Sequence, residues 1–459
     1  MSGEENGRAG RHGRIGDRHG AAPEGGWGWV VLASTVAVLA LTLAFPACVG
    51  IFYSDLQKDF QASNSQTSWV PAIMTAALHA GGPLCSVLVE RAGCRATVML
   101  GGVLSGLGVA AGSFARSVGQ LYITAGAVAG LGFCFSYQPA VTILGQYFVE
   151  RRAFANAVSS TGTALGLCAL PALADFLRER FGWRGSFLVL GAVLFHCCVC
   201  GALMRPLWPP PPPAEPGTRR GFVACVAKHL ALDQLLHNRR YAVYAAAITW
   251  TMLGFVVPLL YLVPYATAHG TEAGRAASLL SALGAVNVAA RPPAGAVFGL
   301  RRFRGRHVYV FSAALLLNGL SNLVCCAGPA FPVLLSYALL YGLSMSAVGS
   351  LMFTVLMDTV DAGRFPSALG LLSVMESVTL LAGPPLAGLL LDATGDHRLI
   401  FAGCAAVVAS AAVFLGVAFW RMDTEERARD CDDAAAEGRP LSEDSATVHS
   451  PMPREADRL

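Results

Sequence analysis

Long apolar runs alternate with short polar segments along most of the chain. Each run is about 20 residues long, which is enough for a helix to cross a hydrocarbon core of about 30 Å. No run shows the alternation of apolar and polar residues that an outer-membrane β-strand requires. The pattern therefore predicts an all-α polytopic membrane protein with twelve transmembrane helices. The predicted spans are residues 28–52, 66–89, 96–114, 119–146, 153–175, 185–204, 241–266, 276–300, 307–327, 331–357, 366–391 and 399–420.

A proline-rich segment divides these spans into two sets of six. Its run WPPPPPAEPGTRR cannot be helical, because proline lacks an amide donor and clashes with the preceding turn. A stiff polyproline-like spacer and a ligand for an SH3-type domain both fit this composition. The two terminal segments are polar, so we expect them to be disordered. The predicted divisions are an N-terminal tail (1–27), an N-terminal half (28–204), a linker (205–240), a C-terminal half (241–420) and an acidic C-terminal tail (421–459).

Positive charges fall mainly on one side of the predicted membrane. Of the 33 lysine and arginine residues, 25 lie on the side of the two termini and seven on the opposite side, while Arg291 lies inside a span. Cytoplasmic loops of membrane proteins carry the excess of positive charge. Both termini are therefore predicted to be cytoplasmic.

The composition agrees with a membrane protein and argues against several other classes. Hydrophobic residues make up 54% of the chain and charged residues 14%, against roughly 25% charged residues in soluble proteins. A net charge of +4 is too small and too dispersed for a nucleic-acid-binding protein. Most of the 13 cysteines lie in apolar runs, where free cysteine packs as a small hydrophobic residue. Because no Walker-type phosphate loop and no H-E-x-x-H motif occurs, we expect no cofactor, no metal and no enzymatic activity.

The loop between the second and third predicted spans, GPLCSVLVERAGCR, combines charged residues with glycines. Gly82, Glu90, Arg91, Gly93 and Arg95 match the pattern G-x(7)-D/E-R-x-G-x-R/K, so the chain resembles the major facilitator superfamily. The resemblance implies two six-helix halves, with charges that hold the cytoplasmic helix ends together in one state. Glu90, Arg91 and Arg95 are therefore predicted gating residues. The simpler alternative is a positively charged cytoplasmic loop.

Further motifs resemble one family of this superfamily, the monocarboxylate transporters. EGGWGW (24–29) has the form of the family's first signature, at the entry to the first span. YFVERRAFANA (147–157), FGWRGSFLVLG (181–191) and ARPPAG (290–295) resemble its loop after span 4, its entry to span 6 and its span 8. The resemblance covers nearly all of residues 24–420. It implies a plasma-membrane carrier of monocarboxylates that works by alternating access in the lipid bilayer. Some family members also have a single-span immunoglobulin-type glycoprotein as a partner.

Arg291 lies in the predicted eighth span and is followed by Pro292 and Pro293. An arginine in a bilayer costs several kcal/mol and is kept almost only where it faces protein or water. We expect the two prolines to interrupt the helix at this depth, beside a water-filled path. The guanidinium fork can hold a carboxylate through two parallel hydrogen bonds, a role that the family resemblance also implies. Arg291 is therefore predicted to bind the substrate in a central cavity, and a structural ion pair with another helix is the alternative.

Two positions differ from the proton-linked members of the family. Those members carry an aspartate one turn before the arginine and a lysine after Phe-Pro in the first span, where this chain has Asn287 and Ala47. Neither side chain can take up a proton, so the proton-linked symport of lactate is in question for this chain. Together with Leu43 and Phe353, these uncharged residues predict an apolar site suited to a bulkier organic carboxylate.

Four other side chains are candidates for coupling or gating. Glu376 in span 11 is predicted to accept a proton or to pair with Arg291, and a helix-packing ion pair is equally open. His79 in span 2 titrates in the right range, although a hydrogen-bonded buried histidine is the simpler interpretation. Arg152 and Asp358 lie at cytoplasmic helix ends, where we expect a gating or structural role. A membrane receptor or scaffold that signals through its tails is the alternative to a carrier.

Overall fold

The computed structural model describes residues 25–148, 152–207, 232–298, 300–303, 305–360 and 365–436, and every regular element in these ranges is helical. The all-α fold predicted from the apolar pattern is confirmed. The N-terminal half contains α1 (Trp27–Leu43), α2 (Phe45–Cys48), η1 (Val49–Phe52), α3 (Tyr53–Phe60), α4 (Asn64–Ala80), α5 (Gly82–Gly112), α6 (Val118–Leu121), the π-helical η2 (Tyr122–Val128), α7 (Ala129–Tyr147), α8 (Arg152–Leu194) and α9 (His196–Leu203). The C-terminal half contains α11 (Leu232–His237), α12 (Arg239–Phe255), α13 (Val257–Ala268), α14 (Ala273–Phe298), η3 (Arg301–Phe303), α15 (His307–Ser321), η4 (Asn322–Ala327), α16 (Phe331–Thr359), α17 (Phe365–Thr394) and α18 (His397–Ala436).

These helices supply twelve membrane crossings once one long segment is divided. Ten segments of the described chain are long and apolar enough to cross a membrane, and α4 with the start of α5, bent by 47°, makes an eleventh. The segment Val158–Leu203 has 46 residues, which would extend about 69 Å at 1.5 Å per residue, about twice the thickness of a bilayer core. Its helix contains one non-helical residue, Gly182, where the chain turns back. It therefore forms the fifth and sixth crossings.

Single glycines make two of the turns between crossings. Gly93 in α5 has φ 80° and Gly182 in α8 has φ 64°. A positive φ strains residues that carry a Cβ atom, so glycine suits both positions. Both lie in motifs that the sequence analysis identified, GCR and FGW. The motifs thus mark the places where one crossing ends and the next begins.

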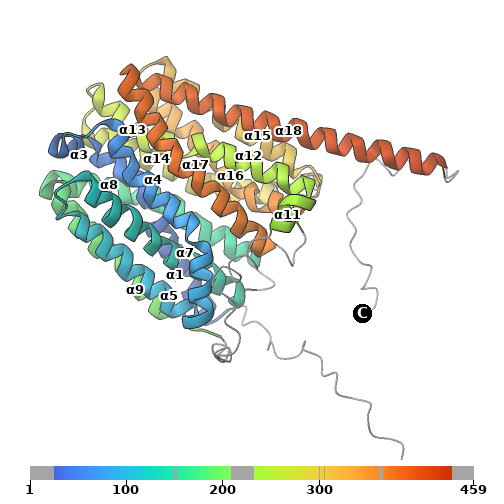
Figure 1. Ribbon diagram of the computed structural model, residues 1–459, viewed down its shortest axis with the longest axis horizontal. Coiled ribbons are helices and arrows are strands. Elements are labelled where there is room, and N and C mark those ends of the chain that lie inside the picture. The colour runs from blue at the N-terminus through green and yellow to red at the C-terminus, as the bar shows by residue number, and fades with distance from the viewer. Residues whose placement is uncertain are drawn as a thin grey trace, which may run out of the picture.

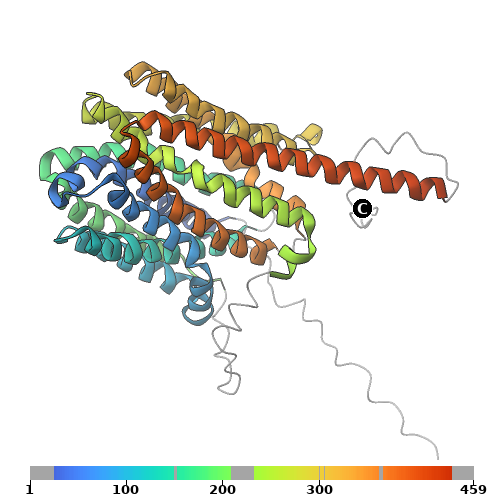
Figure 2. The same cartoon turned by 45° about the horizontal axis from the view of Figure 1, so that its top comes forward.

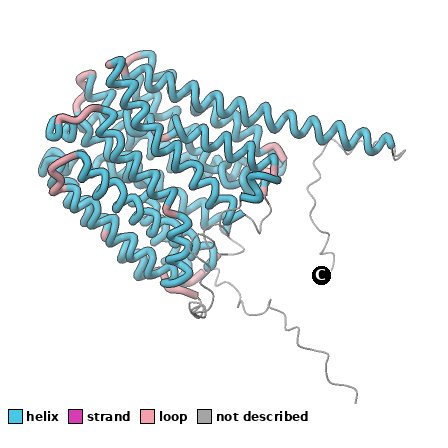
Figure 3. Tube along the Cα trace, in the orientation of Figure 1, coloured by secondary structure: helices cyan, strands magenta, loops and turns pink. Residues whose placement is uncertain are grey.

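The two halves lie side by side in the bundle (Figures 1 and 2), and the regular elements described are all helical (Figure 3). In Figure 1 the N-terminal half is coloured blue to green and the C-terminal half yellow-green to red. The halves meet mainly where α4 packs against α17 and where α8 packs against α14.

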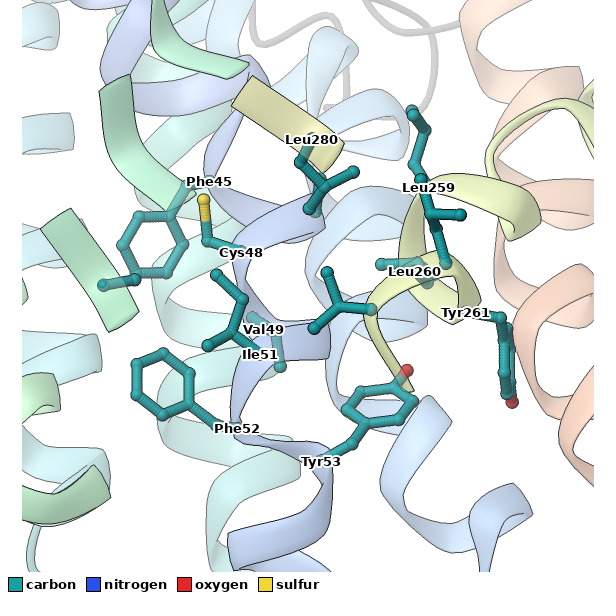
Figure 4. Close-up of a cluster of buried hydrophobic side chains, with 14 of the residues drawn as sticks. Phe45, Cys48, Val49, Ile51, Phe52, Tyr53, Leu259, Leu260, Tyr261 and Leu280 are labelled. Carbon is teal, nitrogen blue, oxygen red and sulfur yellow. The ribbon is translucent and has the colours of Figure 1, made fainter. Parts of the chain in front are cut away.

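One apolar cluster, which we call the seal, crosses both halves at the end of the bundle opposite the chain termini. Phe45, Cys48 and Phe52 come from the N-terminal half, while Leu260 and Leu280 come from the C-terminal half (Figure 4). Each of these side chains is at most 3% exposed. Nearer the termini, the described buried residues form separate clusters, each confined to one half. Among the described residues, a shared cluster of buried apolar side chains therefore joins the halves at the end opposite the termini.

The last helix is longer than the sequence analysis predicts. The predicted C-terminal tail begins at residue 421, but α18 continues to Ala436 and extends past the rest of the bundle (Figure 1). Arg240 of α12 forms ion pairs with Asp423 and Glu426 of α18, each at 2.6 Å. The segment RMDTEERAR also consists mainly of residues that favour helix. The predicted start of a disordered tail at 421 is therefore wrong.

The predicted linker lies largely outside the described residues, which resume at residue 232. Its last part is helical, because α11 occupies Leu232–His237 and α12 begins at Arg239. Asn238 caps α12 by accepting a hydrogen bond from the amide nitrogen of Tyr241. The C-terminal half thus begins a few residues before the predicted boundary at 241.

Two glycines bring the backbones of the halves into contact. A Cβ atom on Gly284 of α14 would lie 2.5 Å from the amide nitrogen of Cys168 in α8. A Cβ atom on Gly50 of η1 would lie 2.5 Å from the carbonyl oxygen of Leu260 in α13. Membrane helices use small residues in this way, because close packing replaces the hydrophobic effect as the source of their association.

We predict that Gly284→Val destabilises the protein, because the new side chain overlaps backbone atoms of the other half. Overpacking of this kind costs about 1–3 kcal/mol. The melting temperature of the purified protein should fall. Gly403→Val in α18 is the matched control, because a Cβ atom there meets no atom within 4 Å. Equal melting temperatures for the two variants would contradict the close contact.

Candidate functional site

Arg291 lies in α14 at the boundary between a buried part of the helix and a largely exposed part. The buried residues of α14 all precede it: Ala276, Ala277, Leu279, Leu280, Leu283, Gly284 and Asn287. After it, five of the six residues 292–297 are exposed. Consecutive helical residues point about 100° apart, so this end of α14 is uncovered on several sides. The helix nevertheless continues through Pro292 and Pro293 to Phe298, so the predicted interruption is wrong.

The guanidinium of Arg291 connects the two halves. Its Nη1 donates a hydrogen bond to the carbonyl oxygen of Ser160 in α8 at 2.8 Å. A Cβ atom on Gly349 of α16 would lie 2.5 Å from Nη2, so glycine leaves room for the guanidinium. Nε is buried and has no hydrogen-bond partner. Within the described ranges Arg291 forms no ion pair, so its charge is unpaired and its Nε is free to bind a carboxylate.

Two further candidate residues are buried and have polar side-chain atoms without a hydrogen-bond partner. Asn287, one turn before Arg291, is 1% exposed, and neither its amide oxygen nor its amide nitrogen is bonded. Glu376 of α17 is 4% exposed, and its Oε1 is unbonded. An unpaired buried polar group costs about 1–3 kcal/mol, and native proteins rarely leave one without water or a ligand. These atoms are therefore available to hydrogen-bond a polar molecule.

Glu376 lies near tyrosines and not in an ion pair with Arg291. Its carboxyl group is within electrostatic range of the hydroxyl groups of Tyr137 in α7 and of Tyr241 and Tyr244 in α12. The described part of the chain contains no ion pair between Glu376 and Arg291. Glu376 and Arg291 therefore do not form a direct contact between their charged groups in this conformation.

The predicted apolar lining is divided between two places. Ala47 is 6% exposed and belongs to the seal, against which Leu43 also packs. Phe353 is 39% exposed and lies one turn beyond Gly349 on α16. Ala47 and Leu43 therefore lie toward the closed end, and Phe353 lies on the side of Arg291 that faces the other end.

His79 has a partner in its own helix. Its Nδ1 lies 2.8 Å from the carbonyl oxygen of Thr75, one turn earlier in α4. This is the geometry of a hydrogen-bonded histidine in a helix, the simpler of the two interpretations. No hydrogen bond or ion pair of the described residues connects it to Arg291.

The predicted gating residues do not form one cluster in the described structure. Asp358, near the end of α16, contacts Nδ1 of His307 at the start of α15 at 2.8 Å. Arg91 and Arg95 are exposed. The side chains of two others lie outside the described residues, namely Glu90 and Arg152.

An acidic clamp between the halves was missed in the sequence analysis. Asp392, near the end of α17, accepts hydrogen bonds from the amide nitrogens of Asn64 and Ser65, each at 3.0 Å, and from the Asn64 side chain at 2.8 Å. These groups form the start of α4, which Ser63 and Gln66 fix with a capping box. A carboxylate at a helix N-terminus pairs with amide groups that lack helical partners. The sequence contains the S-x-x-Q signal and the acid, but it does not show that they meet.

Comparison with known proteins agrees with this architecture. The family profile of the Major Facilitator Superfamily matches residues 30–304 and 248–451. Human monocarboxylate transporter 6 is 48% identical over 91% of this chain and 85% of its own length. The mouse protein of that name is 46% identical (94% and 93%), and rat monocarboxylate transporter 3 is 44% identical (88% and 82%). The chain belongs to the monocarboxylate transporter family. It is a multi-pass membrane transporter and not an enzyme, as the motifs predict.

In this transporter one end of the path between the halves is closed. The seal and the Asp392 clamp join the halves at the end opposite the termini, while the apolar clusters at the other end stay separate. Transporters with alternating access move one half against the other around a central site. The conformation is therefore that of a carrier closed on the side opposite its termini.

We predict that Asp392→Asn favours opening at the closed end, because it removes the charge that holds the start of α4. The carboxylate is partly exposed, so the effect should be modest, about fivefold or about 1 kcal/mol. The measurement is the rate at which a membrane-impermeant maleimide, applied on that side, labels Cys48, which is 2% exposed in the seal.

Cys48→Ser in the same background identifies the labelled residue. The matched control is Asp396→Asn, because Asp396 accepts a hydrogen bond from Arg398 at the start of α18 and not from the other half. Labelling that is as slow in Asp392→Asn as in the unmodified chain would rule out the clamp.

Proposed function

We propose that this chain is a plasma-membrane carrier of monocarboxylates or bulkier organic carboxylate anions, with both termini in the cytosol. The excess of arginine on the side of the termini supports this orientation. The relatives named monocarboxylate transporters support the class of substrate. In this orientation the sealed end is extracellular, and the state described above is open toward the cytosol.

The observation that carries the proposal is the guanidinium of Arg291 between the halves, with an unpartnered Nε and an unpartnered Asn287 one turn away. A substrate carboxylate binds Nε and a terminal nitrogen in a bidentate pair, which arginine geometry favours. The Asn287 amide donates to the substrate, and its oxygen accepts from a hydroxyl group or water. The Ser160 contact breaks as the halves move, since Ser160 and Arg291 lie on different halves.

Substrate binding neutralises the positive charge of Arg291, which stays buried when both ends of the path close during transport. A buried guanidinium without a counter-ion costs several kcal/mol, and a carboxylate with good geometry offsets much of this cost. In the proton-linked pattern an aspartate stands beside the arginine, and it must take up a proton before a substrate carboxylate can pair with the guanidinium. With Asn287 the loaded site is neutral without a proton. Proton coupling in this chain, if it occurs, therefore depends on Glu376.

We predict that Arg291→Gln reduces the apparent affinity for carboxylates at least about tenfold, because hydrogen bonds to charged groups contribute about 1.5–3 kcal/mol. Arg291→Lys should recover part of it, because lysine keeps the charge but lacks the fork. The measurement is saturable uptake of a panel of labelled aliphatic and aromatic carboxylates by cells with equal surface expression. Arg302→Gln, which changes an exposed arginine, is the control. Unchanged saturable uptake in Arg291→Gln would refute the assigned role.

A second prediction concerns Asn287→Asp, which places a carboxylate one turn before Arg291 on the same helix face. At neutral pH the new carboxylate occupies the guanidinium and slows uptake. Protonation at lower pH frees Arg291, so uptake should rise as the external pH falls, more steeply than in the unmodified chain. Uptake at two external pH values and two membrane potentials measures this effect. A pH profile identical to that of the unmodified chain would show that position 287 does not interact with the substrate site.

A receptor or scaffold role receives no separate support from the described residues. Trans-stimulated exchange of a labelled carboxylate across vesicles distinguishes the carrier, because a scaffold shows no exchange. The single-span immunoglobulin-type glycoprotein stays a prediction from the family resemblance, and co-expression with surface labelling tests it.

A further inference from the structure

A groove between the first and last helices of the C-terminal half lies away from the substrate site. It is formed by α12 and α18 and has a volume of about 740 Å³. Its walls are mainly apolar and its mouth is basic; the residues that define it are Arg239, Val243, Val413, Phe414, Val417 and Arg421. We call it the α12–α18 groove. We propose that it binds one anionic phospholipid of the leaflet on the side of the chain termini, with the phosphate at Arg239 and Arg421 and an acyl chain along the apolar wall.

The groove has the depth of one leaflet. On α18 it extends from Ala409 to Met422, which at 1.5 Å per residue is about 20 Å. Half of a hydrocarbon core of about 30 Å is about 15 Å. Near its inner end, Trp250 of α12 donates a hydrogen bond from its indole nitrogen to Ser410 of α18 at 3.0 Å. A lipid chain fits this depth, whereas a transmembrane helix of a partner would need a surface across both leaflets.

The apolar wall faces outward from the bundle. Val413, Phe414 and Val417 are 52%, 49% and 45% exposed, although they lie in the centre of a membrane-spanning segment. In a membrane the surrounding molecules at such a surface are lipid acyl chains. The groove therefore has an apolar wall that suits an acyl chain and arginines at its mouth that suit a charged headgroup.

The charges at the mouth favour an anion. Arg239 pairs with Glu425 at 2.8 Å, while Arg421 forms no ion pair among the described residues. The neighbouring acids of α18, Asp423 and Glu426, are engaged by Arg240, which does not line the groove. The mouth thus has two arginines and one acid. A phosphodiester placed between the arginines replaces or shares the Glu425 contact, and basic pockets between helices recognise anionic headgroups in this way.

The proposal is tested with the purified full chain and native mass spectrometry, by comparing retained phosphatidylserine with retained phosphatidylcholine. Arg421→Gln and Arg239→Gln should each weaken retention of phosphatidylserine about fivefold, which corresponds to about 1 kcal/mol for each arginine. Glu425→Gln should strengthen it, because the acid no longer competes for Arg239. Val417→Trp should abolish it by filling the groove while both arginines remain.

The matched control is Arg427→Gln, which changes an exposed arginine of the same helix outside the groove. Elution as a single species and an unchanged melting temperature show that each variant is folded. Equal retention of the two lipids by the unmodified chain would overturn the proposal, as would an equal loss in Arg427→Gln. A second copy of the chain on this face would also overturn it, and it would appear as a dimer that Val417→Trp disrupts. The leaflet is cytoplasmic if the proposed orientation holds, but lipid retention does not depend on carboxylate transport.

Discussion

The structure depends on the requirement that a permanent cation in a membrane protein must have partners inside the protein. Arg291 meets this requirement with one carbonyl group of the opposite half, Ser160, and with space left open by a glycine, Gly349. One hydrogen bond to a neutral oxygen is a weak counterpart for a full charge. The guanidinium is therefore kept in place by protein on one side and left available on the other. A site of this kind favours the arrival of an anion.

The two ends of the bundle show how the halves can move around this point. At the sealed end the contacts are apolar side chains, close glycine backbones and one charged clamp, so they can separate without leaving an ion pair buried in lipid. At the other end each half has its own apolar cluster and needs no support from its partner. Two independently packed halves with one reversible contact surface are what a rocking motion needs. The Asp392 clamp fixes the relative placement of α17 and α4, because the amide groups at the start of a helix bind a carboxylate only when the two are aligned.

The sequence predicted the parts of this arrangement that depend on one helix at a time. Apolar length predicted the spans, and the glycine motifs marked the turns at Gly93 and Gly182, because positive φ is a local property. Arg291 was found because an arginine within a membrane span is energetically unfavourable whatever residues surround it, so the sequence alone marks it as a candidate functional residue. The Asp392 clamp was missed because it joins residues more than 300 positions apart. The extension of α18 was missed because charged residues beyond an apolar run look like a disordered tail until their partner, Arg240, is known.

The separation of Glu376 from Arg291 suggests how such a carrier can differ from its proton-linked relatives. An acid one turn from the arginine would neutralise it whenever substrate is absent, and the proton would then become part of each transport cycle. Here that position is an amide, and the buried acid Glu376 of α17 forms no ion pair with Arg291 among the described residues. The empty site keeps its charge, and substrate itself supplies the missing anion. Replacing the aspartate with Asn287 therefore removes the obligatory proton, and replacing the lysine with Ala47 leaves the loaded site neutral, while the volume released near the seal is available to the body of a larger substrate.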